Sequence, residues 1–169
     1  MSWSSQIRLT VAAFAGATLM AACGFHLRGD VTYTFPTIYV TSPAPQPIVT
    51  ELKRTLDVST ETTRLVDSPK EAAVTLEIVS VVDDKGVLSL SGGGRVREYA
   101  LTKRVSFNLR DKEGRDWMPA GEIVIRRSYT FNESEVLARE HEETRVLREM
   151  QTEAVQQIVR RLQAARKPM

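Results

Sequence analysis

Residues that could catalyse a reaction or bind a metal are few in this chain and poorly spaced for either task. Gly92, Gly93 and Gly94 lack the lysine, the hydroxyl residue and the helix of a phosphate-binding loop, so they predict a hairpin loop. With only His26 and His141, a histidine metal centre is not expected, and His141 is predicted to be solvated. The adjacent Asp83 and Asp84 favour a solvated turn. No nucleophile–base pair can be proposed, and we predict a protein that is not an enzyme.

The single cysteine, Cys23, follows a segment with the composition of a secretory signal. Arg8 is the only charged residue before it, and the apolar run that follows ends at Ala21 and Ala22. That run, at about a dozen residues, is shorter than the ~20 residues of a membrane-spanning helix. We therefore predict that residues 1–22 are a signal peptide that is removed.

A cysteine directly after small residues resembles the lipobox of bacterial lipoproteins. The resemblance implies a diacylglycerol on the Cys23 thiol and an N-acyl chain on the same residue; no other cofactor and no metal are predicted. Gly24 at the next position resembles lipoproteins sorted to the outer membrane of Gram-negative bacteria. The alternative is a plain signal peptide that leaves Cys23 as a free thiol, which would be reactive in an oxidising compartment.

Length and charge predict one domain that is soluble apart from its lipid. The formal charge of +2 falls to +1 once Arg8 is removed, which gives no signal for a nucleic-acid partner. One cysteine excludes an intramolecular disulfide, and no later segment approaches membrane-spanning length.

The apolar pattern predicts an alternation of strands and helices. A β-branched run predicts a strand at 37–41, and Pro47 with an apolar repeat every four residues predicts a helix over about 46–57. A strand begins at 74–78, has a bulge or doubly buried stretch at 79–82 and a kink or turn at 83–86, and resumes at 87–91. Two later strands alternate cleanly. They span 99–110 and 123–131, on either side of a charged turn at 111–116.

The last predicted element is a helix over about 135–165. Asn132 and Glu135 have the spacing of a capping box, and Pro168 follows the helix. The first half, 135–146, is mostly charged and is expected to fray or project, whereas the second half is amphipathic and is expected to pack on the sheet.

This element order predicts the α+β class: a two-layer sandwich of a four-stranded, mostly antiparallel sheet with two helices on one face. The predicted organisation is a signal peptide at 1–22, a lipidated tether at 23–36, one domain at 37–166 and a tail at 167–169.

Basic residues gather in the middle of the chain. Ten basic and five acidic residues lie between Lys85 and Arg127, with Arg95 and Arg97 beside the glycine loop. Lys103 and Arg127 stand at positions of apolar parity in their strands. They predict either snorkelling at the sheet edges or a basic strip that faces an anionic, lipid-bearing ligand.

Several segments of the mature chain resemble the LptE family of LPS-assembly lipoproteins. They are Cys23-Gly24-Phe25-His26-Leu27-Arg28-Gly29, Arg97-Glu98-Tyr99-Ala100-Leu101, Arg127-Ser128-Tyr129-Thr130-Phe131-Asn132, Leu147-Arg148-Glu149-Met150 and Ile158-Val159-Arg160-Arg161-Leu162. The resemblance covers nearly the whole mature chain with a similar order of elements.

The resemblance implies a plug that sits in the lumen of the outer-membrane β-barrel LptD in a 1:1 complex, on the periplasmic side of the membrane. Such proteins help the barrel assemble and bind lipopolysaccharide (LPS). The family's basic ligand-binding positions fall on the loop that enters the third strand and near the start of the last helix. They indicate Arg95 and Arg97, offset by a few residues, and Arg139. Lys103 and Arg127 are further candidates through their place in the basic strip alone.

Two other functions stay open. The protein could brace the barrel without touching LPS, in which case the arginines would face acids of the barrel. It could also be a periplasm-facing lipoprotein that binds another protein or cell-wall material, and it would then show no association with a barrel.

Overall fold

The computed structural model describes residues 32–59, 63–130 and 136–168. The predictions for the signal peptide, Cys23 and the capping residues Asn132 and Glu135 lie outside this range. The elements are β1 (Thr37–Thr41), α2 (Pro47–Ser59), β2 (Arg64–Leu65), β3 (Val74–Leu90), β4 (Val96–Asp111), β5 (Asp116–Thr130) and α3 (Val136–Ala164). The two predicted helices and the strand at 37–41 are confirmed.

The strands form one mixed sheet in the order β2-β1-β3-β4-β5. β1 is parallel to β2 and β3, whereas β3, β4 and β5 form two antiparallel hairpins. The predicted α+β class is confirmed, but the prediction of four strands is wrong. The fifth strand, β2, is only two residues long, and it pairs through Arg64 and Leu65 with the start of β1. A strand this short has no alternation that a sequence could reveal.

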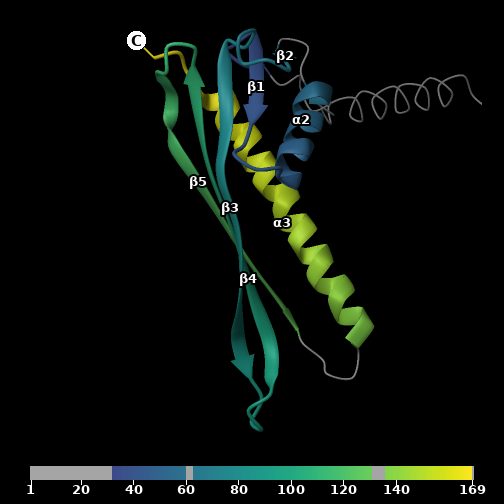
Figure 1. Ribbon diagram of the computed structural model, residues 1–169. Helices are drawn as coiled ribbons and strands as arrows, with labels where there is room; N and C mark the ends of the chain where they lie inside the picture. The colour runs from purple at the N-terminus through teal and green to yellow at the C-terminus, as the bar shows by residue number, and fades with distance from the viewer. Residues whose placement is uncertain (1–31, 60–62, 131–135, 169) are drawn as a thin grey trace, which may run out of the picture.

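The strand β3 continues much further than its neighbour β1. Its pairing with β1 ends at Glu77, and from there to Leu90 it pairs with β4 alone. The irregularity between Ile78 and Ser80 confirms the predicted bulge. The kink or turn predicted at 83–86 is wrong, because these residues pair in continuous register with β4. The result is a long hairpin that projects beyond β1 and α2 (Figure 1).

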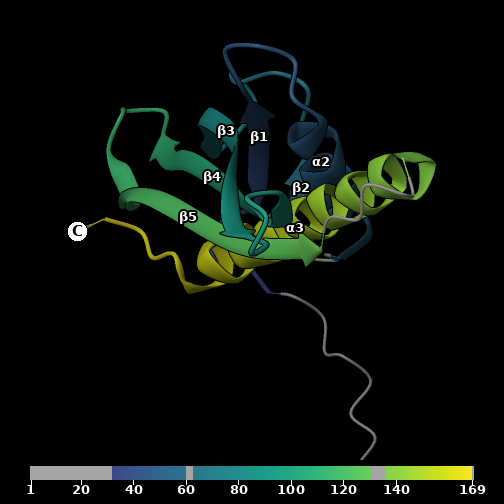
Figure 2. The same cartoon turned by 90° about the horizontal axis from the view of Figure 1, so that it is seen from below.

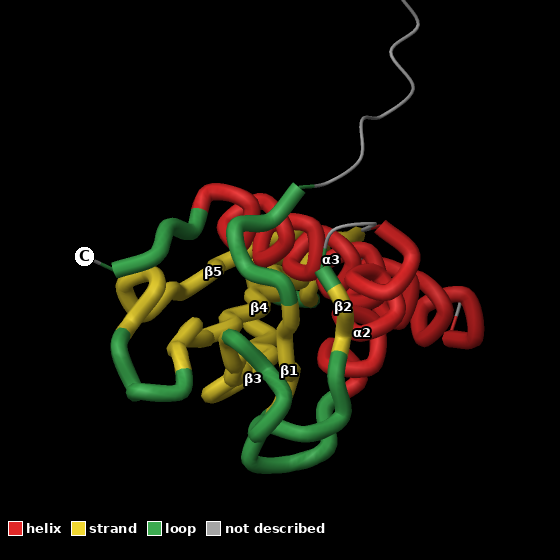
Figure 3. The backbone as a smooth tube through the Cα atoms, turned by 90° about the horizontal axis from the view of Figure 1, so that it is seen from above, coloured by secondary structure: helices red, strands yellow, loops and turns green. Residues whose placement is uncertain are grey.

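Both helices cover the same face of the sheet (Figures 2 and 3). Buried side chains of the helices and of alternate strand positions form a single cluster, which includes Ile48, Leu52 and Leu56 from α2, Ile38, Val40, Leu76, Phe107 and Ile123 from the strands, and Met150, Ala154, Ile158 and Leu162 from α3. The removal of this apolar surface from water is the main term that holds the layers together. The prediction that the second half of α3 packs on the sheet is confirmed.

The segment before β1 belongs to the folded domain. Tyr33 and Phe35 are 5% and 1% exposed, and their rings stack with centroids 5.3 Å apart. The Thr63 hydroxyl donates a hydrogen bond of 2.7 Å to the Phe35 carbonyl, and the Thr34 hydroxyl donates one of 3.0 Å to the Ala165 carbonyl. These contacts correct the predicted end of the tether at residue 36, because two aromatic side chains of that segment fill the core.

The close approach of α3 to β5 explains the glycine at position 121. A Cβ atom there would lie 2.8 Å from both the Phe107 ring and the Arg161 guanidinium. Arg161 donates a hydrogen bond of 2.9 Å to the Glu122 carbonyl across the same gap. A side chain at Gly121 would force the Phe107 ring and the Arg161 guanidinium out of their places.

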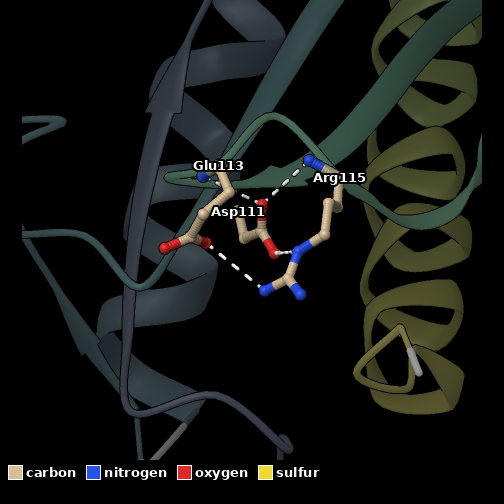
Figure 4. A network of polar contacts seen from close by, with 3 residues as sticks. All are labelled: Asp111, Glu113 and Arg115. Carbon is tan, nitrogen blue, oxygen red and sulfur yellow. Dashed lines mark hydrogen bonds and ion pairs between the residues drawn. The ribbon is translucent and has the colours of Figure 1, made fainter.

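The charged turn predicted at 111–116 is confirmed. The Asp111 side chain holds it together (Figure 4). Its carboxylate accepts hydrogen bonds from the backbone N–H groups of Glu113 and Arg115, at 3.0 and 2.8 Å, and from the Arg115 side chain at 2.8 Å. Burial raises the pKa of Asp111, but the hydrogen bonds and charge of Arg115, with the hydrogen bond from Glu113, together outweigh it, so the net pKa is lowered. Gly114 completes the turn with a φ of 78°.

Candidate ligand-binding site

The loop between β3 and β4 lies at the far end of the long hairpin, past the start of α3 (Figure 1). It is a hydrogen-bonded turn: the Ser91 N–H donates to the Arg95 carbonyl at 2.7 Å, and the Gly94 N–H donates to the Ser91 carbonyl at 2.9 Å. Gly94 has a φ of 77°, which favours glycine. The side chains of Arg95 and Arg97 are exposed. The predicted loop is therefore confirmed, and it presents two cations at the tip of the molecule.

Lys103 lies on the helix-covered face of β4 and is only 3% exposed. Its ammonium lies 2.6 and 2.8 Å from the two carboxylate oxygens of Asp83, the residue opposite it on β3. The Asp83 side chain is 44% exposed, so the pair reaches from the core to solvent. Asp83 thus lies in a strand and serves as an ion-pair partner, rather than in the solvated turn that the sequence predicts.

Arg127 lies on the same face in β5, and its guanidinium is bound to the carboxylate of Glu153 in α3. On the opposite face of the sheet, Arg104 pairs with Asp84 at 2.5 Å. Neither Lys103 nor Arg127 is therefore an unpaired cation of the predicted basic strip. A phosphate group that reached either one would have to compete with a carboxylate that is already in place.

Arg139 falls in the first turns of α3, which begins at Val136. Its side chain lies outside the described residues, as does the whole of Cys23. The structure thus places Arg95 on the loop, Arg97 at the second residue of β4 directly after it, and Arg139 in the helix. His141, two residues further along, is exposed as predicted.

A group of four residues that the sequence did not single out joins the hairpin to α3. We call this group, Lys85, Tyr99, Tyr129 and Glu143, the Glu143 cluster. The Lys85 ammonium donates to the Glu143 carboxylate at 2.5 Å, and the Tyr129 hydroxyl donates to the same oxygen at 2.6 Å. The two tyrosine rings stack with centroids 5.7 Å apart, and the Lys85 ammonium lies 4.4 Å from the centroid of Tyr99.

Protonation in this cluster follows from its contacts. The hydrogen bond from Lys85, followed by that from Tyr129, lowers the pKa of Glu143. Burial raises the pKa of Tyr129. Burial on its own lowers the pKa of Lys85, but the hydrogen bonds and charges of Glu143 and Tyr129 together outweigh it, so the net pKa of Lys85 is raised. Because the pKa of Glu143 is lowered on folding, its contribution to stability is present above the ordinary carboxyl pKa and is lost as the pH falls through the lowered value.

The alternation of the strands gives a signal for three members of the cluster, but not for their partner Glu143. Lys85, Tyr99 and Tyr129 all occupy core-facing positions of their strands, where a cation and two hydroxyls need partners. Over the described ranges, no group of three or more His, Cys, Asp or Glu residues is arranged to hold a metal ion. In the same part of the chain, neither helix has the length and hydropathy needed to cross a membrane.

Fold and surface together define a small two-layer α+β protein with a long hairpin and a basic loop at its tip, without a recognisable catalytic centre in the described residues. The chain belongs to the LptE family, "Lipopolysaccharide-assembly", whose sequence model matches residues 35–162. The predicted family is thereby confirmed, and the match begins at Phe35, in agreement with the corrected start of the domain.

Two named relatives and a solved structure agree with this assignment. The chain is 26% identical over 147 residues to "LPS-assembly lipoprotein LptE" of Pectobacterium atrosepticum, covering 85% of this chain and 78% of the relative. It is 27% identical over 162 residues to the protein of the same name in Photorhabdus laumondii, covering 91% and 84%. The solution structure of uncharacterized lipoprotein B from Nitrosomonas europaea is similar with a TM-score of 0.73 and 35% identity, covering 83% of this chain and 91% of that one. Neither the family nor these relatives indicate a catalytic activity.

Proposed function

We propose that this protein is an outer-membrane lipoprotein, anchored through lipid on Cys23, that occupies the lumen of the LptD β-barrel and takes part in the assembly of that barrel. The observation that carries the proposal is the family match over residues 35–162, which spans every element from β1 to the second half of α3. The names of the two LptE relatives support a role in LPS assembly and a lipoprotein anchor.

The proposal includes direct binding of LPS through the hairpin loop and the start of α3. Arg95 and Arg97 are exposed at the loop, and arginine suits the bidentate recognition of phosphate groups. Arg139 would contribute from the helix. Lys103 and Arg127 would play a secondary part, because Asp83 and Glu153 already bind them.

The experiment that tests the partner is an affinity purification of the tagged, lipidated protein from detergent-solubilised outer membrane, with bound proteins identified by mass spectrometry. We expect one large β-barrel protein to be recovered at a 1:1 ratio. A variant with Cys23→Ala, expressed behind a cleavable signal peptide, serves as the control for the anchor, and it should lose membrane association. Recovery of the protein alone, or with soluble periplasmic proteins, would contradict the barrel proposal and favour a lipoprotein with another partner.

Binding of LPS is tested by reversing the charge of the proposed arginines. The triple variant Arg95→Glu, Arg97→Glu, Arg139→Glu should bind purified LPS about tenfold more weakly or worse, because charge-assisted hydrogen bonds contribute roughly 1.5–3 kcal/mol each when formed. The measurement is a titration of labelled LPS at fixed ionic strength, with circular dichroism as a check that the variant is folded.

A matched variant with the same change in net charge separates a site from a general charge effect. Lys70, Lys112 and Arg160 are exposed. Lys70 precedes β3 and Lys112 follows β4, at the end where Val74 pairs with Asp111, opposite the loop. Their replacement by glutamate should leave LPS affinity within about twofold. Equal losses in both triple variants would argue against the proposed site. If only barrel affinity fell in the first variant, the protein would act as a brace whose arginines face the barrel.

A further inference from the structure

The Glu143 cluster occupies the one place where the long hairpin and the first half of α3 are joined by described polar side chains. Its members come from four elements: Lys85 from β3, Tyr99 from β4, Tyr129 from β5 and Glu143 from α3. One carboxylate oxygen accepts both the ammonium at 2.5 Å and the tyrosine hydroxyl at 2.6 Å. The side chain of Glu143 is 28% exposed, so these bonds are partly shielded from water.

Few other described side chains of residues 141–145 reach the sheet. Among the described side chains of α3, those from His141 to Arg145 are exposed or half-exposed, and the first buried one is Val146. Glu142 binds only Arg145 on its own helix, at 2.5 Å. The next described ion pair to the sheet, between Glu153 and Arg127, lies almost three turns further on. Among the described side chains of α3, Glu143 is therefore the main polar link between residues 141–145 and the sheet.

The cluster also lies close in the chain to both basic elements of the proposed site. Arg97 precedes Tyr99 by two residues in β4, and Arg139 precedes Glu143 by about one helical turn. A continuous path of contacts leads from the strand of Arg97 through Tyr99 and Lys85 to Glu143.

We propose that Lys85, Tyr129 and Glu143 are positioning residues, which hold the first turns of α3 at a fixed distance from the hairpin so that both basic elements meet one anionic, phosphate-bearing lipid. This inference rests on the proposed function. None of the three residues contacts the lipid. A helix end that moved freely would lose conformational freedom when the ligand bound, and the cluster removes most of that cost before binding.

The test compares Glu143→Gln and Tyr129→Phe with Glu142→Gln in the full-length lipidated protein. Glu142→Gln removes the same charge one residue away but breaks a contact that stays within α3. We expect the backbone amides of residues 141–147 to exchange with deuterium roughly tenfold faster in Glu143→Gln, while amides of the β4 core do not change. Tyr129→Phe keeps the ring stack and should show a smaller increase.

Affinity for purified LPS provides the second measurement. The affinity should fall roughly fivefold in Glu143→Gln, although the arginines of the proposed site are unaltered. It should stay constant in Glu142→Gln, which loses the same charge. Unchanged exchange at 141–147 would overturn the positioning role. Faster exchange with unchanged LPS affinity would show that the cluster orders the helix without serving the ligand, and would overturn the inference as well. If the unaltered protein did not bind LPS at all, the proposed function would fail, and the exchange measurement would still report on the cluster.

Discussion

Replacement of Phe35 by alanine is expected to lower the free energy of unfolding by about 3–5 kcal/mol. The side chain is 1% exposed, stacks on Tyr33 and meets Trp117 edge-to-face with centroids 5.8 Å apart. A truncation would leave a cavity between β5 and the segment before β1, and the surrounding rings could close it only in part. Urea unfolding followed by circular dichroism gives the difference directly.

The appropriate control is an apolar residue that is exposed. Val58 in α2 is 82% exposed, and Val58→Ala should change the free energy of unfolding by less than about 0.5 kcal/mol. A cost below about 1 kcal/mol for Phe35→Ala would mean that residues 32–36 act as a tether, as their sequence suggests. A large cost would confirm that the folded domain begins before β1.

The parts of the fold that the sequence predicted are those with a strong, local period. The stripe from Leu147 to Leu162 repeats at helical spacing, and the alternation in β4 separates a buried face from a polar one. The missed parts lack such a period. β2 is held by its neighbour β1 rather than by its own two side chains, and Asp83 and Asp84 resemble turn residues until their partners on β4 are known.

The residues of the candidate site likewise fall into those that the sequence could predict and those that it could not. Arg95 and Arg97 could be chosen because a glycine loop and two nearby cations are adjacent in sequence. The Glu143 cluster could not, because its lysine and its carboxylate are 58 residues apart, and only the crossing of the hairpin and α3 brings them together. The alternation marks Lys103 and Arg127 as unusual residues for core-facing positions. It does not reveal the carboxylates that bind them, because Asp83 and Glu153 belong to other elements.

The pair of Lys103 and Asp83 should respond very differently to the removal of one partner or the other. Asp83→Ala is expected to cost about 2 kcal/mol, because it leaves a buried ammonium without a counter-charge. This figure is below the ~3–5 kcal/mol of a fully buried pair because the Asp83 side chain is 44% exposed and water can enter once it is gone. Lys103→Met should be nearly neutral, since an apolar chain of similar length fits between Leu101 and Val105 and opposite Ile125.

The neighbouring Asp84 provides the control, because it has the same charge and strand but binds Arg104, whose side chain is 43% exposed. Asp84→Ala should therefore cost no more than about 1 kcal/mol. Equal costs in free energy of unfolding for the two aspartates would show that the buried position of Lys103 adds nothing to the strength of its pair with Asp83.

LPS titration of Lys103→Met separates a structural role from a role in binding. We expect an affinity within about twofold of that of the unaltered protein, because the Lys103 ammonium is buried and already paired with a carboxylate. A tenfold loss with unchanged stability would instead make Lys103 a direct ligand contact and extend the site from the hairpin loop into the sheet.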